Sequence, residues 1–336
     1  YDGIADIDVT EIDIDNIPTT RTQAMLNIAN PSAAFRWWRL PADGIGLARM
    51  EFIIANHIKI HPMALIRFED VADERERAEI ERLTAGYDTK SEYFVDKLSR
   101  GVAHIAAAYY PDPVVVRMSD FKTNEYAKLL GGSSLERVEE NPMLGFRGAS
   151  RYASDEYRPA FELECRALRV VREDMGLTNV IPMIPFCRTL EEADAVLAIM
   201  EQCGLARGRN GLEVYVMCEV PSNVVLAREF AARFDGFSIG SNDLTQLALG
   251  VDRDNAALAS VFDESNPAVK RLIEEVIRSA HAEGCTVGFC GQAPSNDPAY
   301  AAFLVDAGID SISVDPDSVI AVVRTVAEAS DARPLA

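Results

Sequence analysis

The sequence predicts a single α/β domain folded as a (β/α)8 barrel, the TIM barrel architecture. Short apolar stretches alternate about eight times with stretches of helical period, which is typical of a parallel sheet. Eight such units in roughly 300 residues fit a closed barrel better than an open, doubly wound sheet. The composition agrees, because 48% hydrophobic and 26% charged residues are usual for one folded domain, and no second hydrophobic core is visible in the 336 residues.

The first 30 residues are expected to be a linker segment that leads into the barrel. Residues 6–17 alternate isoleucine or valine with acidic residues, a period-2 pattern that predicts a short edge strand or connector ending at Pro18. The chain opens on Tyr1 rather than methionine, so we expect a piece of a longer protein. Residues 31–336 are then expected to form the barrel domain.

Strands and helices follow one another along the rest of the chain. The predicted strands are residues 44–49, 114–117, 145–147, 180–185, 214–219, 236–240, 286–290 and 311–314. The weakest is the third, because it lies within residues 119–157, a segment rich in glycine and charge that we expect to be an extended loop. Apolar residues at helical spacing predict helices that include residues 190–203, 222–234, 268–283 and 299–307.

The charge and cysteine content exclude several function classes. The chain carries 33 basic and 53 acidic residues, and the net charge of −20 disfavours nucleic acid or an anionic membrane as partner. An anionic ligand would have to be held by a local cluster of arginines. The six cysteines include no C-x-x-C pair, which argues against a disulfide framework or a zinc site and favours a reducing, cytoplasmic compartment. No apolar stretch approaches the roughly 18 residues of a membrane span.

Polar residues at the ends of the predicted strands are the candidate functional groups. In a (β/α)8 barrel, active groups come from the carboxyl ends of the strands and from the loops that follow them. The residues at these positions are Arg49, Arg117, Arg147, Glu219, Asn242, Asp243 and Cys290. Three arginines, two carboxylates and a thiol are therefore predicted to face one mouth of the barrel.

Glu219 and Asp243 are candidate metal ligands. They end successive predicted strands and lie 24 residues apart, which is one strand–helix unit, so adjacent parallel strands would bring the carboxylates together. Hard oxygen ligands with no histidine nearby favour Mg²⁺. The alternative interpretation is that both residues cap the helices after their strands, since acidic residues are common there.

The arginines form a candidate anion site. Arg151 and Arg253 lie in loops next to the three strand-end arginines, and guanidinium groups offer paired donors to carboxylate and phosphate. Their number in an acidic protein favours binding of a planar anion held on a divalent ion. The alternative is that they are solvated or packed surface residues, as most arginines are.

Cys290 is a candidate proton-transfer group. It lies in G-F-C-G-Q (residues 288–292), where Gly288 and Gly291 let the backbone approach a ligand closely. A thiol with a reference pKa of about 8.5, lowered by nearby cations, can exchange a proton with carbon. The alternatives are a nucleophile, for which no histidine lies nearby in sequence, and a small buried hydrophobic residue. The histidines, which we interpret as structural or surface residues, are His57, His61, His104 and His281.

Six motifs in order resemble the PEP-utilising enzymes. The motifs are G-I-G-L-A-R-M-E-F (44–52), V-V-V-R-M-S-D-F-K-T-N-E-Y (114–126), N-P-M-L-G-F-R-G-A-S-R-Y (141–152), V-M-C-E-V-P (216–221), F-S-I-G-S-N-D-L-T-Q (237–246) and G-F-C-G-Q (288–292). The resemblance extends over residues 19–319. The family comprises the phosphoenolpyruvate synthases, pyruvate phosphate dikinase and enzyme I of the bacterial sugar phosphotransferase system. The second and third motifs are most similar to the phosphoenolpyruvate synthases.

The resemblance implies a (β/α)8 barrel that binds phosphoenolpyruvate or pyruvate with Mg²⁺. By position, Glu219 and Asp243 match the metal ligands, and Ser241 and Asn242 match residues that contact the substrate. Cys290 matches the acid/base group at the methylene carbon. The arginines that match those around the phosphoryl and enolate oxygens are Arg49, Arg117, Arg147 and Arg253. Of this set, the expected catalytic residues are Arg49, Arg117 and Cys290.

The resemblance also implies partners outside these 336 residues. Members of the family pass phosphate through a histidine on a separate domain. The phosphoenolpyruvate synthases and pyruvate phosphate dikinase also have an ATP-grasp domain. Neither the motif around that histidine nor a glycine-rich ATP loop is found in this sequence. We therefore expect a C-terminal substrate domain, preceded by a phosphohistidine domain, of a homodimeric enzyme that converts pyruvate, ATP and water to phosphoenolpyruvate, AMP and phosphate. The alternatives are a domain similar to enzyme I and a non-catalytic barrel that senses phosphoenolpyruvate.

Overall fold

Eight parallel strands close into a barrel in the order in which they occur in the sequence. The computed structural model describes residues 20–331, and in it each strand pairs with its neighbours in the chain while β1 pairs with β8. The strands are β1 (Gln23–Ile28), β2 (Ile45–Arg49), β3 (Val114–Arg117), β4 (Val180–Ile184), β5 (Tyr215–Cys218), β6 (Gly236–Ile239), β7 (Thr286–Phe289) and β8 (Ser311–Val314). The predicted (β/α)8 barrel is confirmed.

One predicted strand is wrong, and one strand was not predicted. Residues 145–147 form an irregular bend, and no strand of the barrel pairs with them. The Phe146 N–H, which a neighbouring strand would otherwise accept, donates instead to the Glu139 carboxylate at 3.0 Å. The missing strand is β1, which lies inside the segment predicted to be a linker. The barrel therefore begins before residue 31. The predicted edge strand at residues 6–17 lies outside the described residues.

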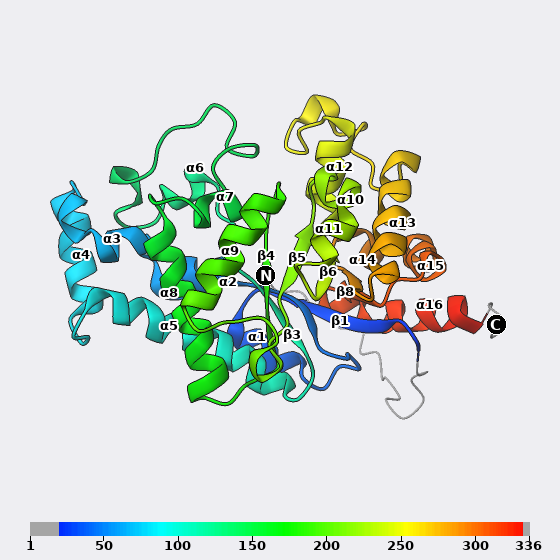
Figure 1. Ribbon diagram of the computed structural model, residues 1–336, viewed down its shortest axis with the longest axis horizontal. Helices are drawn as coiled ribbons and strands as arrows, with labels where there is room; N and C mark the ends of the chain where they lie inside the picture. Colours follow the sequence, from blue (N-terminus) through cyan, green and yellow to red (C-terminus); the bar gives the residue numbers. More distant parts are fainter. Residues whose placement is uncertain (1–19, 332–336) are drawn as a thin grey trace, which may run out of the picture.

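Helices connect the strands and cover the outside of the barrel (Figure 1). They are α1 (Pro31–Trp37), α2 (Met50–Ile53), α3 (Pro62–Ile66), α4 (Glu74–Thr84), α5 (Lys90–Tyr109), α6 (Thr123–Tyr126), α7 (Ala149–Tyr152), α8 (Arg158–Arg169), α9 (Leu190–Gln202), α10 (Pro221–Val225), α11 (Ala227–Ala231), α12 (Ser241–Leu249), α13 (Pro267–Ala282), α14 (Ala293–Asn296), α15 (Pro298–Ala307) and α16 (Val319–Asp331). Between residues 20 and 331, none of them combines the length and the apolar character needed to cross a membrane.

The predicted helices at residues 190–203, 268–283 and 299–307 are confirmed as α9, α13 and α15. The stretch predicted as one helix at residues 222–234 is divided into α10 and α11, because Leu226 leaves the helical backbone region with φ −108° and ψ 31°. The long segment that follows β3 contains only two short α-helices, α6 and α7, as expected for an extended loop.

Two apolar layers position the mouth of the barrel. The larger layer lies between the strands and the surrounding helices, and the strands are buried on both faces, as parallel strands usually are. The smaller layer fills the barrel interior below the mouth and consists of Leu47, Val115, Ile181, Met183, Met217 and Cys290. Groups at the strand ends therefore stand on a packed floor rather than over an open pore.

At the opposite end of the barrel, Gly46 on β2 permits close packing against β8. A methyl group at this position would lie 1.6 Å from Ser313 Oγ and 2.9 Å from Ser313 Cβ. Ser313 is buried, and because the methyl group would meet Cβ as well as Oγ, rotation of the hydroxyl alone would not remove the clash.

We predict that Gly46→Ala lowers the free energy of unfolding by about 1–3 kcal/mol, the usual cost of overpacking a core. In the Gly46→Ala/Ser313→Gly double variant, most of this loss is restored because the clashing atoms are gone. Urea unfolding measures both. Gly86→Ala is the control, because nothing lies within 4 Å of the added methyl group. An equal effect of the two alanine substitutions would contradict the packing argument.

Candidate active site

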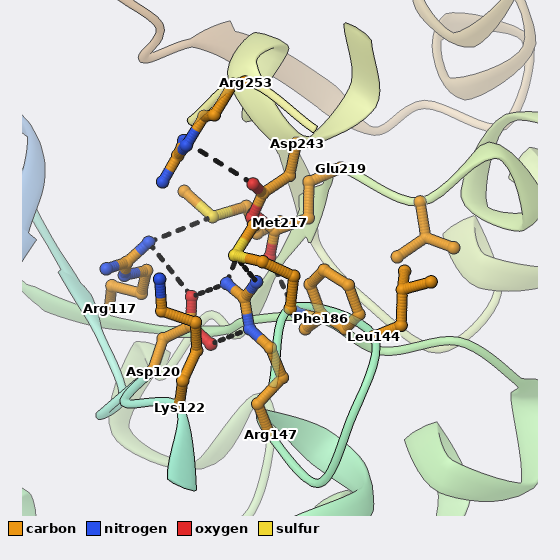
Figure 2. Close-up of polar contacts among 12 residues, drawn as sticks. Arg117, Asp120, Lys122, Leu144, Arg147, Phe186, Met217, Glu219, Asp243 and Arg253 are labelled. Atoms are coloured by element: carbon orange, nitrogen blue, oxygen red, sulfur yellow. Dashed lines mark hydrogen bonds and ion pairs between the residues drawn. The ribbon is translucent and has the colours of Figure 1, made fainter. Parts of the chain in front are cut away.

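A cavity of about 670 Å³ opens at the carboxyl ends of the strands. All of the residues predicted as ligands of metal or substrate line it: Arg49, Arg117, Arg147, Glu219, Ser241, Asn242, Asp243, Arg253 and Cys290. Figure 2 shows several of these side chains converging from different loops. The structure therefore brings the predicted set together in one place, while the chemical role of each residue remains a prediction.

Three carboxylates meet in this cavity. Glu219 follows β5, Asp243 lies in the first turn of α12 after β6, and Asp120 lies just after β3. One oxygen of each residue lies within 4.8 Å of the others, and all three residues are buried. The sequence predicted the pairing of Glu219 with Asp243, but Asp120 was missed.

The three carboxylates suit a hard cation. Burial raises the pKa of Glu219 well above its ordinary value, and repulsion from Asp120 and Asp243 raises it further. Asp243 Oδ1 is buried and makes no hydrogen bond within the described residues. A cation coordinated by these oxygens would relieve the repulsion and satisfy this atom.

The alternative interpretation of Glu219 and Asp243 as helix caps is not supported. Glu219 Oε1 accepts the Phe186 N–H at 2.7 Å, a contact with the turn after β4 rather than with the helix that follows Glu219. No side chain caps α12 through a hydrogen bond. Both carboxylates point into the cavity instead.

Two arginines are paired with carboxylates at the mouth. Arg117 lies 3.0 Å from Glu51. It also lies 3.4 Å from Asp120, while Arg147 lies 2.6 Å from Asp120 and 3.0 Å from Asp243 (Figure 2). Burial alone would lower the pKa of each guanidinium, but the carboxylates outweigh it and raise both pKa values. Both side chains therefore stay cationic.

The remaining cavity groups leave positive charge for a ligand, while the Ser241 hydroxyl is already engaged by another residue. Burial lowers the pKa of Arg49, and the neighbouring Arg117 lowers it further, which shows that positive charge is crowded here. Arg253 Nη1 lies 3.6 Å from Asp243 Oδ1 at the rim. Ser241 donates a hydrogen bond to Glu264. An anion near Arg49 and Arg117 would be favoured because it would relieve their repulsion.

Arg151 does not belong to the anion site, contrary to expectation. It is buried, pairs with the Glu136 carboxylate, and lies 4.5 Å from the centre of the Tyr126 ring and 4.9 Å from that of Tyr157. Its role is to hold the loop after β3. His61 also contacts Glu136, at 2.9 Å, which fits the structural role predicted for it.

Cys290 lies on the cavity wall directly after β7. The thiol is buried, and Sγ lies 3.4 Å from the Ile239 carbonyl oxygen, to which it donates. Burial raises the pKa of Cys290 to about 11, although a hydrogen bond with Ser238 and the charge of Arg117 act to lower it. The cations Arg117 and Arg49 act in the expected direction, but burial dominates, so the pKa lies above its ordinary value rather than below it.

Glu51 and Asp120 are buried cavity carboxylates that sequence reasoning missed. Glu51 Oε1 accepts the Asp120 N–H at 2.5 Å, so a side chain of α2 is tied to the backbone of the loop after β3. Neither residue ends a strand, and each follows a strand-end arginine by two or three positions, after Arg49 and Arg117 respectively. A search for acidic residues just beyond these arginines would have found both.

The family model described as "PEP-utilising enzyme, PEP-binding domain" matches residues 8–331. The chain belongs to the PEP-utilising enzymes. The resemblance seen in the six motifs is thereby confirmed, and the cavity described above lies in the PEP-binding domain of the family.

Curated relatives are similar to this PEP-binding domain over nearly its whole length. Phosphoenolpyruvate synthase from Synechocystis sp. is 58% identical, over 99% of this chain and 41% of that protein. Phosphoenolpyruvate synthase from Escherichia coli is 49% identical, over 98% of this chain and 41% of that protein. The chain thus spans about two fifths of the length of these relatives. Among solved structures, a malate synthase from Haloferax volcanii is 14% identical with a TM-score of 0.48, over 93% of this chain and 76% of that chain, a likeness too weak to inform function.

We predict that the ion pair of Glu136 makes the stability of the domain depend on acid pH. Burial would raise the pKa of Glu136, but hydrogen bonds from Arg151 and His61 lower it from 4.5 to about 2. A lowered folded-state pKa stabilises the fold above pH 4.5, and this contribution is lost as the pH falls towards 2.

Glu136→Gln should therefore be less stable than the wild type at pH 7, and the difference should shrink as the pH is lowered from 4.5 to 2. Urea unfolding at several pH values tests this. Glu81→Gln, an exposed change on α4, serves as control. A difference that does not vary with pH would rule out the ion pair as its source.

Proposed function

We propose that this chain is the substrate domain of a phosphoenolpyruvate synthase (pyruvate, water dikinase), which converts pyruvate, ATP and water to phosphoenolpyruvate, AMP and phosphate. The observation that carries the proposal is the convergence of arginines, three carboxylates and a buried thiol in one cavity of a PEP-binding domain. The arginines would bind the negative charges of the substrate, the carboxylates would hold a divalent cation, and the thiol would move a proton at carbon. The names of the relatives support this enzyme over enzyme I.

The carboxylates would bind the cation, and the arginines would bind the anionic substrate. Glu219 and Asp243 would hold Mg²⁺, with Asp120 as the third nearby carboxylate. When bound, Mg²⁺ would supply Lewis acid stabilisation of the enolate oxygen of pyruvate. Arg49 and Arg117 would bind the substrate carboxylate and phosphoryl oxygens through paired donors, with Arg147 and Arg253 beside them. Donors fixed in advance by ion pairs stabilise developing charge without reorganisation.

Cys290 would move the proton at the methyl carbon. In the direction of pyruvate formation, the protonated thiol donates its proton to the methylene carbon of the enolate. In the direction of phosphoenolpyruvate formation, the thiol must first lose its proton; the thiolate then removes a methyl proton, and the enolate oxygen attacks phosphorus of a phosphohistidine as the P–N bond breaks and histidine leaves. A thiol pKa of about 11 supports a resting group that is protonated, which suits proton donation in the direction of pyruvate formation.

Other parts of a longer protein would complete the reaction. The chain spans about two fifths of its relatives, which leaves room for phosphohistidine and ATP-grasp domains in the same polypeptide. A homodimer in the cytoplasm is the expected assembly. A barrel that only senses phosphoenolpyruvate would have no need for a proton donor, and the buried Cys290 on the cavity wall argues against it.

The metal assignment predicts that oxalate, a mimic of the pyruvate enolate, binds this domain only when Mg²⁺ is present. Asp243→Asn should weaken oxalate binding at least roughly ten-fold, because it removes a charged oxygen ligand. Isothermal calorimetry measures both effects. Asp88→Asn, an exposed change far from the cavity in sequence, should bind as the wild type does. Binding of equal strength without a divalent cation would exclude this site.

The assignment of Cys290 predicts a separation of binding from proton transfer. In the full-length protein, Cys290→Ser should keep oxalate binding and formation of phosphohistidine from ATP, because neither step needs a proton at carbon. Exchange of the pyruvate methyl protons with deuterated solvent, followed by NMR, should fall about 100-fold or more. Cys285→Ser is the control, because this buried thiol hydrogen-bonds the Phe234 carbonyl away from the cavity. Wild-type exchange in Cys290→Ser would return the residue to a packing role.

A further inference from the structure

The turn after β4 contains a buried aromatic residue in an unusual backbone conformation. Phe186 has φ +47°, in the left-handed region that bulky residues rarely adopt, and only 2% of its surface is exposed. Such a conformation costs energy and persists only where surrounding contacts hold it. The Phe186 N–H donates to Glu219 Oε1 at 2.7 Å, so this backbone conformation is tied to one of the three cavity carboxylates.

The ring of Phe186 supports two guanidinium groups. Arg147 Cζ lies 4.1 Å from the ring centre and Arg188 Cζ lies 4.5 Å from it. Figure 2 shows the ring beside the Arg147 side chain. Cations over an aromatic face in a site shielded from water are attracted more strongly than at the surface. Phe186 does not line the cavity, so any influence on a ligand would pass through Arg147 or Glu219.

Arg188 joins the turn after β4 to the backbone around Arg147. Its guanidinium donates to the carbonyl oxygens of Gly145 at 2.6 Å and Arg147 at 3.3 Å, and to Ser150 Oγ at 2.9 Å. These acceptors surround Arg147, and those of Gly145 and Arg147 lie in the stretch that was predicted to be a strand. Hydrogen bonds from Arg188 take the place of a strand ladder in fixing this stretch.

Close packing completes the contact between the two segments. The Ala149 N–H donates to the Pro185 carbonyl oxygen at 3.1 Å. Gly148 has φ +61°, and a methyl group at this position would lie 2.5 Å from Pro185 O and 2.6 Å from Phe186 Cβ. The segment of residues 144–150 therefore lies directly against the segment of residues 185–188.

We infer that Phe186 and Arg188 are positioning residues, which fix Arg147 for contact with the phosphoryl group and hold Glu219 in place for the cation. Arg147 comes from a loop and not from a strand, yet Arg147 Nη2 reaches Asp120 at 2.6 Å and Asp243 at 3.0 Å. The contacts with Phe186 and Arg188 supply the rigidity that a strand would otherwise provide. The inference rests on the proposed function, since it concerns the same cavity.

The first test needs no ligand. Hydrogen–deuterium exchange of the 336-residue chain should show amides in residues 144–150 exchanging about ten-fold faster in Phe186→Leu and in Arg188→Gln than in the wild type. Phe230→Leu is the matched control, a fully buried phenylalanine on α11, and should leave this segment unchanged. If Phe186→Leu does not fold, Arg188→Gln still tests the inference. Unchanged exchange in both variants would overturn the inference.

The second test asks whether Phe186 acts through Arg147. Binding of phosphoenolpyruvate with Mg²⁺, measured by calorimetry, should weaken roughly ten-fold in Phe186→Leu. In an Arg147→Lys background, where the paired donors are already lost, the same change should weaken binding less than about two-fold. Equal effects in both backgrounds would show that Phe186 does not act through Arg147. If the wild-type chain binds no phosphoenolpyruvate, the proposed function fails, while the exchange measurement still decides whether the two segments are held together.

Discussion

Buried charge determines how the side chains at the mouth of this barrel are arranged. Arg117 and Arg147 have side chains only 17% and 5% exposed, and a buried charge without a partner is strongly destabilising. Glu51, Asp120 and Asp243 supply the partners, and Asp120 contacts both guanidinium groups. Neither sign of charge could be buried here alone. The ion pairs therefore hold the side chains that face the cavity in fixed relative positions.

A second set of buried polar contacts anchors the loop that carries Asp120. The backbone N–H of Ser119 donates to Glu164 at 3.1 Å, its hydroxyl also contacts Glu164 and lies 2.7 Å from the Tyr126 hydroxyl, and its carbonyl accepts from Tyr152. Burial raises the pKa of Glu164 to about 7. Because these contacts hold Ser119, the adjacent Asp120 has little conformational freedom, although it belongs to a long loop. This anchoring explains how a connection without regular strands can carry cavity residues.

The sequence predicted the barrel well where strands are short apolar runs that end in a polar residue, as in 114–117 or 236–240. It failed at β1, whose polar surroundings hid it, and at residues 145–147, where an arginine between glycines resembled a strand end. The rule that polar residues at strand ends face one mouth correctly placed Arg117, Glu219 and Cys290 in one cavity. It missed Glu51 and Asp120 because neither residue ends a strand: each lies two or three positions beyond a strand-end arginine, and the contact between them forms only when the chain folds. Nor could it show that burial would outweigh nearby cations in setting the pKa of Cys290.

The burial of Cys290 has a consequence for the chemical durability of the protein. Peroxides and alkylating reagents attack thiolates that they can reach, and oxidation beyond the sulfenic acid is mostly irreversible. With 5% of its surface exposed and a pKa of about 11, this thiol is almost entirely protonated and shielded at neutral pH. Under oxidative stress, Cys290 would be damaged more slowly than an exposed cysteine of ordinary acidity. The same environment that keeps the thiol protonated thus protects the sulfur atom from oxidants.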